Sequence, residues 1–105
     1  MVSKITVKDV ADYIRISEIS KEDESLINKL ITIAKKFITS YTGLEEIELD
    51  KHEDLTIVIY ILCQDMYDNR SLYVDKSNLN KVVETILGMH SVNLLWLMQV
   101  NIIKK

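Results

Sequence analysis

The residues most able to position a substrate form a short polar cluster near the middle of the chain. Asp65, Asp68, Asn69 and Arg70 place two carboxylates beside a guanidinium. On a helix, however, Asp65 and Asn69 lie one turn apart while Asp68 faces another flank, and the cluster supplies neither a nucleophile nor a base to activate one. We therefore interpret the cluster as the polar end of a helix, with Arg70 pairing to a carboxylate or to the helix end.

Metal binding and covalent catalysis find little support in the spacing of the remaining candidates. Neither His52 nor His90 has another good ligand within the short spacing of motifs such as HxxxH or CxxC. The acidic run from Glu45 to Asp54 lacks the ligand spacing of a calcium loop and the glycine at its sixth position. Cys63 stands in an apolar run without a nearby histidine, so we expect a buried thiol. The sequence predicts no catalytic residue, no metal and no cofactor, and hence no enzyme.

Composition limits the possible partners. The chain has 105 residues, no proline, two glycines and a formal charge of -3. This length predicts one domain with one core, and the shortage of turn residues favours helices over sheets. The acidic balance argues against direct nucleic acid binding, since neutralising the phosphates of a duplex depends on clustered Lys and Arg, and we expect no sequence-specific nucleic acid binding. A single cysteine fits a reducing, intracellular compartment. We expect no signal peptide, because the N-terminal residues contain no apolar core of the required length, and no membrane span, because no segment has 18 or more apolar residues.

The clearest element is an amphipathic helix predicted over residues 21-42. Its apolar residues recur at spacings of three and four between Leu26 and Tyr41. Ser20 can cap its first turn, and Gly43 can adopt the left-handed conformation that ends a helix.

A shorter helix is predicted over residues 6-15. Thr6 followed three residues later by Asp9 is typical of a helix N-cap, and apolar residues follow with helical spacing.

A third helix is predicted over residues 51-71, after an acidic loop at 44-54 in which Asp50 is expected to cap the helix. Its apolar face is broader than a single stripe, which predicts a central helix touched on several sides. The β-branched residues also allow a buried strand at 56-62, but the apolar pattern continues too long to favour it.

A fourth helix is predicted over residues 78-88, with Ser77 or Asn78 as its cap and Gly88 as its C-terminal stop. Together these elements predict an all-α fold, a small bundle of about four helices.

The C-terminal segment follows a different pattern, so we divide the chain into a helical domain over 1-91 and an assembly segment over 92-105. Apolar residues occupy the even positions of this segment, which are Val92, Leu94, Trp96, Met98, Val100 and Ile102. Such alternation is typical of an extended strand, although Leu95 and Leu97 interrupt it. A lone apolar strand is an aggregation hazard unless another chain covers it or it folds back as a helix onto the core.

Four landmarks in order carry a family resemblance. They are VKDVADYIRI, DESLINKLITIAKKFITSYTG, DLTIVIYILCQDMYDNRS and VVETILGMHSVNL. In this order, over about residues 4-95, the chain resembles the small head-tail connector proteins of tailed bacteriophages, which are also described as adaptor or DNA-packaging proteins. Tyr67, Asn69 and Arg70 match the landmark at the end of the third helix, to which the family assigns no chemistry. Residues 96-105 are more apolar than the family pattern.

The resemblance implies a virion structural protein without catalysis. Copies of such a protein form a ring, of about a dozen subunits under closed symmetry, between the portal of the filled head and the tail-completion protein. This implies a location in the virion neck, or in the bacterial cytoplasm during assembly, including as a prophage product. The C-terminal segment in this family reaches to the portal or a neighbouring subunit, so we take its six even-numbered apolar residues, with Asn69 and Arg70, as interface candidates.

A second hypothesis comes from another functional class. A small helical regulatory or antitoxin-like protein that binds one protein partner through its apolar tail accounts equally well for the size, the acidity and the absence of recognisable chemistry. It is expected to form a fixed small complex, whereas a connector forms a ring.

Overall fold

A computed structural model describes residues 1-91, and regular structure in this part of the chain is helical throughout, as predicted. The elements in order are η1 (Val2–Lys4), α1 (Val7–Ile14), α2 (Lys21–Thr42), α3 (Glu46–Leu49), α4 (Asp54–Asp68), η2 (Lys76–Asn78) and α5 (Lys81–His90). The assembly segment and its six interface candidates, Val92 to Ile102, lie outside the described residues.

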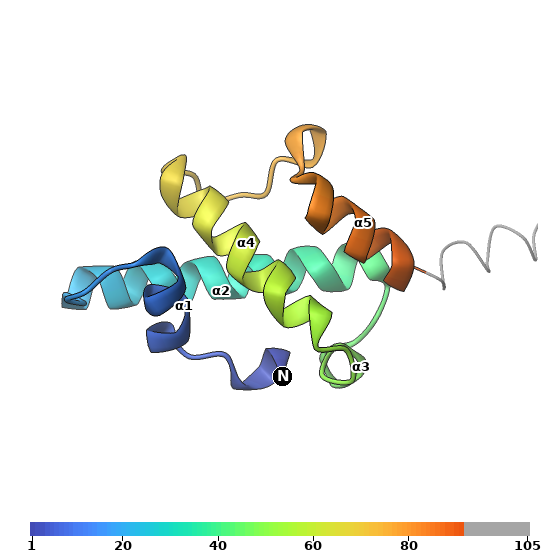
Figure 1. Cartoon of the computed structure of the whole chain (residues 1–105), viewed down its shortest axis with the longest axis horizontal. Helices are drawn as coiled ribbons and strands as arrows, with labels where there is room; N and C mark the ends of the chain where they lie inside the picture. The colour runs from blue at the N-terminus through green and yellow to red at the C-terminus, as the bar shows by residue number, and fades with distance from the viewer. Residues whose placement is uncertain (92–105) are drawn as a thin grey trace, which may run out of the picture.

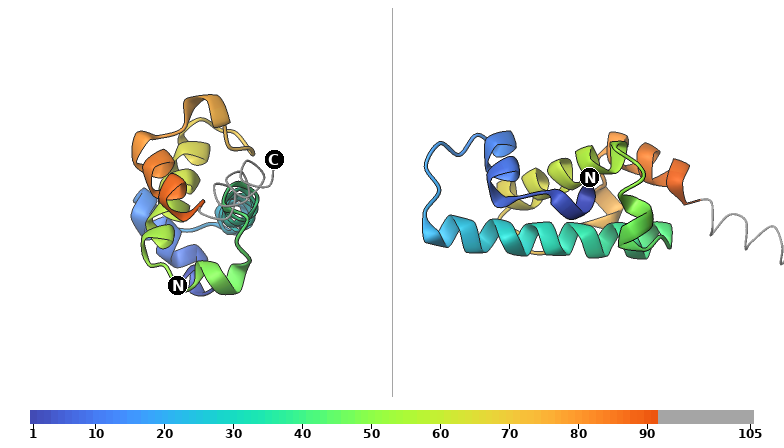
Figure 2. Two further views of the ribbon diagram at one scale, coloured as in Figure 1. Left: turned by 90° about the vertical axis from the view of Figure 1, so that its right-hand side faces the viewer. Right: turned by 90° about the horizontal axis from the view of Figure 1, so that it is seen from below.

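The helices form two layers. α2 runs the length of the helical domain, and α1, α4 and α5 lie against one side of it (Figure 2). α4 crosses over α2 with α1 on one flank and α5 on the other (Figure 1), and it contacts all three. The prediction of a central third helix is confirmed. None of the helices within residues 1-91 is long and apolar enough to cross a bilayer.

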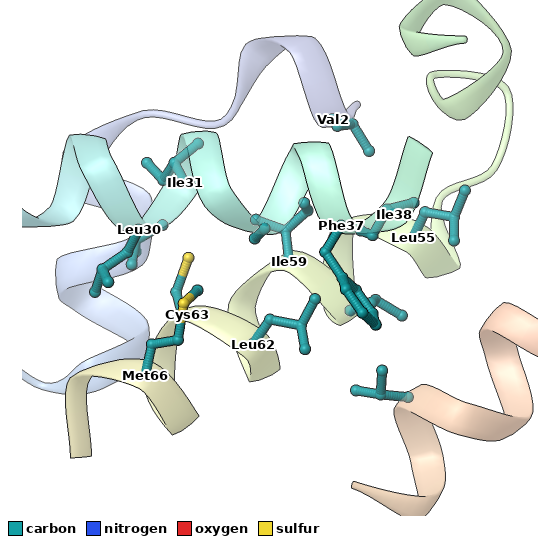
Figure 3. Packing of buried hydrophobic residues seen from close by; sticks show 14 of the residues in the cluster. Val2, Leu30, Ile31, Phe37, Ile38, Leu55, Ile59, Leu62, Cys63 and Met66 are labelled. Carbon is teal, nitrogen blue, oxygen red and sulfur yellow. The ribbon is translucent and has the colours of Figure 1, made fainter. Parts of the chain in front are cut away.

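The core lies mainly between α2 and α4, whose apolar side chains meet as shown in Figure 3. Leu30 and Ile38 of α2, and Leu55 and Ile59 of α4, are fully buried. Each side chain of this size stabilises the fold by roughly 1.5–3 kcal/mol relative to leaving it in water. Val2, in the N-terminal turn η1, is also fully buried.

Local signals determine both ends of α2. The Ser20 hydroxyl accepts a hydrogen bond from the Asp23 backbone N–H at 3.0 Å, and the Asp23 carboxylate accepts one from the Ser20 backbone N–H at 3.3 Å. Gly43, with φ of 75°, ends the helix in the left-handed conformation. The predicted range of 21-42 is confirmed. α1 begins with the same reciprocal arrangement between Thr6 and Asp9, so the predicted cap is confirmed although the helix is one residue shorter at each end than predicted.

The predicted start of the third helix at 51, with Asp50 as its cap, is wrong. The Asp50 carboxylate accepts hydrogen bonds from the backbone N–H and the hydroxyl of Ser3, at 2.8 and 2.6 Å, and so fastens the N-terminus to the end of α3. The acidic loop itself contains the one-turn helix α3, and α4 covers 54-68 where the sequence predicted 51-71. Ser3 and Asp50 are 47 positions apart, so the spacing of neighbouring residues cannot predict their contact.

The predicted boundaries of the fourth helix are also wrong at both ends. Ser77 and Asn78 belong to η2, and the Asn80 side chain caps α5 by accepting a hydrogen bond from the Val82 backbone N–H at 2.8 Å. Gly88 does not stop the helix, which continues to His90. A tertiary contact of the His90 imidazole with Asp54 stabilises this last turn.

Two helices end in a left-handed residue that is not glycine. After α1, Arg15 has φ of 71°, and the Ile16 backbone N–H donates to the carbonyl of Ala11 at 2.9 Å. After α4, Arg70 has φ of 53°, and the Ser71 N–H donates to the carbonyl of Met66 at 3.0 Å. Glycine is preferred here because a Cβ crowds the following carbonyl oxygen in this conformation.

Replacing the exposed Arg15 by glycine is therefore expected to stabilise the fold. Arg15→Gly removes the strain of the left-handed conformation and should raise the free energy of unfolding by about 1 kcal/mol, measured by urea denaturation. Arg15→Ala is the matched control, because it removes the same side chain but keeps the Cβ, and should leave stability unchanged or lower. Equal effects of the two variants would contradict this account of the helix end.

Candidate interaction site

The polar cluster predicted at 65-70 forms the C-terminal end of α4. The Asn69 amide donates to the carbonyl of Asp65 at 2.8 Å and so satisfies a backbone group at the helix end. The Arg70 guanidinium lies over the Tyr67 ring, 4.7 Å from its centroid. Within residues 1-91 Arg70 forms no ion pair with a carboxylate, and of the two predicted partners it contacts the helix end, where Tyr67 belongs to the last turn of α4.

A pocket of about 360 Å³ lies between the end of α4 and the segment that returns through η2. Its polar lining consists of Asp65, Asn69, Ser71, Tyr73, Asp75 and Asn78. Its apolar lining consists of Leu62, Met66, Val74 and Leu79. This volume falls in the range of roughly 300–1,000 Å³ found for small-ligand pockets, but the lining is more polar than is usual for them, with six polar residues and four apolar ones.

The two carboxylates of this pocket are in different environments. Partial burial, with a smaller contribution from Asp68, raises the pKa of Asp65. Hydrogen bonds from Ser77 and Asn78 lower the pKa of Asp75 and hold its carboxylate in place, with the Ser77 hydroxyl at 2.6 Å and the Asn78 amide at 3.1 Å. Within residues 1-91, neither carboxylate forms an ion pair with Lys, Arg or His. The pocket therefore presents negative charge without a cation of its own.

A second set of polar side chains joins the end of α5 to the start of α4. The His90 Nε2 atom lies 2.8 and 3.0 Å from the two carboxylate oxygens of Asp54, and the His52 ring packs against the His90 ring at a centroid distance of 4.3 Å. Asp54 is in the first turn of α4, where a carboxylate interacts favourably with the helix dipole, and His90 is in the last turn of α5. This contact positions the last described turn before the assembly segment.

The two histidines do not complete a metal site in the described part of the chain. Across residues 1-91, no three His, Cys, Asp or Glu side chains are placed to hold a metal ion. Cys63 is fully buried in α4, as predicted, and burial raises the pKa of its thiol to about 12. A thiol of this kind is protonated at neutral pH and packs as a small apolar side chain.

The outer face of α5 carries an exposed apolar row. Val82 and Met89 are 52% and 61% exposed, and the half-buried Ile86 lies between them at helical spacing. The opposite side of α5 contributes Val83 and Leu87 to the core. The exposed row runs along the helix that leads directly into the apolar residues of the assembly segment.

Sequence reasoning missed the pocket and the contact between the two histidines. The sequence predicts Asn78 only as a candidate helix cap, and nothing in local spacing brings Asn78 or Asp75 opposite Asp65. His52 and His90 are 38 positions apart in the sequence. The only available signal was the number of turn-forming side chains between 69 and 80, which predicts a loop but not the surface that the loop encloses.

Comparisons of the chain with protein-family models, with curated proteins and with solved structures give no match.

The Cys63 thiol is expected to resist modification in the folded protein. At pH 8, its reaction with a thiol-specific reagent such as DTNB should be slower than in guanidinium chloride by roughly three orders of magnitude or more, because only the thiolate reacts. Absorbance of the released thionitrobenzoate measures this rate. The added thiol of an exposed Ser17→Cys variant is the control and should react at once. Rapid labelling of both thiols in the native variant would contradict the buried position of Cys63.

The contact between Asp54 and His90 is expected to stabilise the fold. Asp54→Ala should lower the free energy of unfolding by about 1 kcal/mol more than Glu53→Ala, because it removes a hydrogen bond between elements as well as a charge at the helix start. Glu53 is a suitable control since it is an exposed carboxylate beside the same helix terminus. Urea denaturation measures both variants, and indistinguishable values would contradict a stabilising role for the contact.

Proposed function

We propose that this protein is a phage structural protein whose copies form a ring between the portal and the tail-completion protein. The order of sequence landmarks over residues 4-95 supports this proposal through its resemblance to head-tail connectors. The all-helical fold is compatible with it.

The observation that carries the proposal is the apolar surface at the C-terminal end of the helical domain. Val82 and Met89 are exposed on α5, and the sequence beyond this helix continues with closely spaced apolar residues up to Ile103. An exposed apolar row on a domain with its own buried core, followed in the sequence by closely spaced apolar residues, is typical of a protein that binds another chain.

Assembly into a ring places a further demand on the surface. Subunits that contact one another head to tail use two different surfaces of the same chain, and the contact closes into a ring when the rotation between neighbours allows it. We propose that the assembly segment 92-105 supplies one of these two surfaces, or the contact with the portal. In either contact, the Trp96 side chain is expected to be buried against the other chain and to contribute strongly to binding.

The acidic surface is compatible with a position around DNA. A channel wall has to let the duplex slide, and clustered positive charge would bind the phosphates tightly. The chain's net charge of -3 therefore fits a channel that does not retain the duplex.

Negative-stain electron microscopy of the full chain, alone and mixed with the portal protein encoded beside its gene, tests this function. We expect rings, or portals with an additional annular layer. A chain that ends at Ser91 should keep its helical circular dichroism, because the described core lies within residues 1-91, and should lose assembly. Ile47→Ala is a control that removes a highly exposed apolar side chain of α3 and should leave assembly intact.

Two results would count against the connector function. Unaltered portals together with small particles would do so, and a fixed small complex with a different protein would favour the regulatory or antitoxin-like alternative. Rings formed by the chain that ends at Ser91 would instead reject the assembly role of residues 92-105.

A further inference from the structure

We propose that the pocket between α4 and η2 receives the C-terminal end of a neighbouring copy of this chain, with Lys104 and Lys105 facing its carboxylates. This inference rests on the proposed function, since a ring needs a second surface to accept the segment that each subunit extends.

The pocket has the properties needed to hold a lysine side chain. Val74 and Leu79, the partly exposed members of the apolar lining, can contact the four-carbon stem of lysine, while the carboxylates of Asp65 and Asp75 can accept hydrogen bonds from its ammonium group. Asp75 is already oriented by Ser77 and Asn78. Within residues 1-91 no Lys, Arg or His pairs with these carboxylates, and Arg70 lies over Tyr67.

The C-terminal segment has the complementary composition. Its charged side chains are Lys104 and Lys105, and apolar residues precede them directly. The whole chain carries -3, so residues 1-91 without these two lysines carry -5. Attraction between the segment and the domain therefore guides the lysines towards acidic surface, and the pocket is an acidic surface with an apolar lining.

The position of the segment favours a neighbour over the same chain. The His90 contact with Asp54 holds the end of α5 at the start of α4, whereas the pocket lies at the other end of this 15-residue helix, about 22 Å away. α5 itself runs from η2 towards the start of α4 and away from the C-terminal end of α4 (Figure 1). Fully extended, a segment of the length of 92-105 spans at most about 50 Å, which is enough to reach across a subunit boundary. To enter its own pocket it has to turn back along α5.

Charge reversal in the full chain tests the contact. The tail variant carries Lys104→Glu and Lys105→Glu, and the pocket variant carries Tyr73→Lys and Asp75→Lys at two exposed positions. Each is expected to weaken self-association by about 10- to 100-fold, since each places like charges across the contact. Analytical ultracentrifugation of each variant over a concentration series, with and without the portal protein, measures its self-association. Circular dichroism verifies that each variant is folded.

Two further variants keep the test decisive. Asp65→Asn with Asp75→Asn removes the charge with almost no change of shape, so it should weaken assembly even if the pocket variant folds poorly. Lys4→Glu with Lys8→Glu makes the same change in charge as the tail variant at exposed positions near the N-terminus, and assembly should be unaffected.

The decisive result comes from mixing the tail variant with the pocket variant. In a head-to-tail contact between copies, the acidic tail meets the basic pocket and the basic tail meets the acidic pocket, so the mixture should assemble where each variant alone does not. A further chain carries all four changes at once. If this chain assembles but the mixture of the two variants does not, each tail lies in the pocket of its own chain, and the inference is overturned.

The remaining outcomes separate this inference from the proposed function. Rings that form normally despite charge reversal would overturn the inference and leave the connector function standing. Charge-dependent self-association without any binding to the portal would support the inference and count against the connector. A wild-type chain that stays monomeric alone and with the portal would overturn both.

Discussion

The apolar contact between α2 and α4 is the interaction on which the rest of the structure depends. The stripe of α2 is long and narrow, whereas the apolar face of α4 is broad, so α4 can cover α2 and still offer apolar flanks to α1 and α5. Ile59 and Leu30, buried between the layers, are part of this contact. The shorter helices bury their own apolar residues against a surface that the two longer helices create, and in isolation helices of their length are marginal in water.

Polar contacts at the edge of this core determine where the outer segments lie. Ser3 bonds to Asp50 and so brings the N-terminal turn onto α3, while His90 bonds to Asp54 and so brings the end of α5 onto the start of α4. Each pair joins residues more than 30 positions apart, and each lies beside a helix terminus. The edges of the fold therefore rely on a few hydrogen bonds, whereas its centre relies on apolar burial.

The candidate interaction surfaces lie at the end of α4 and along α5, outside the apolar centre of the fold. The chain between α4 and α5 has to cross from one helix to the next, and its turn-forming residues enclose a pocket with two carboxylates and an apolar lining. α5 uses Val83 and Leu87 for the core, which leaves Val82 and Met89 in solvent. An acidic pocket and an exposed apolar row are features suited to binding another protein, and the proposed ring gives both a use.

The sequence by itself determined the helical class, the range of α2, the cap of α1, the buried thiol of Cys63 and the central position of α4. These features depend on residue spacing within one or two helical turns, as with Ser20 and Asp23 at one end of α2 and Gly43 at the other. Only the tertiary structure decided that Asp50 binds Ser3, that α5 continues past Gly88, and that Asp65, Asp75 and Asn78 line one pocket. Those features depend on contacts between segments distant in sequence, and the energy of such a contact leaves no periodic pattern along the chain from which it could be predicted.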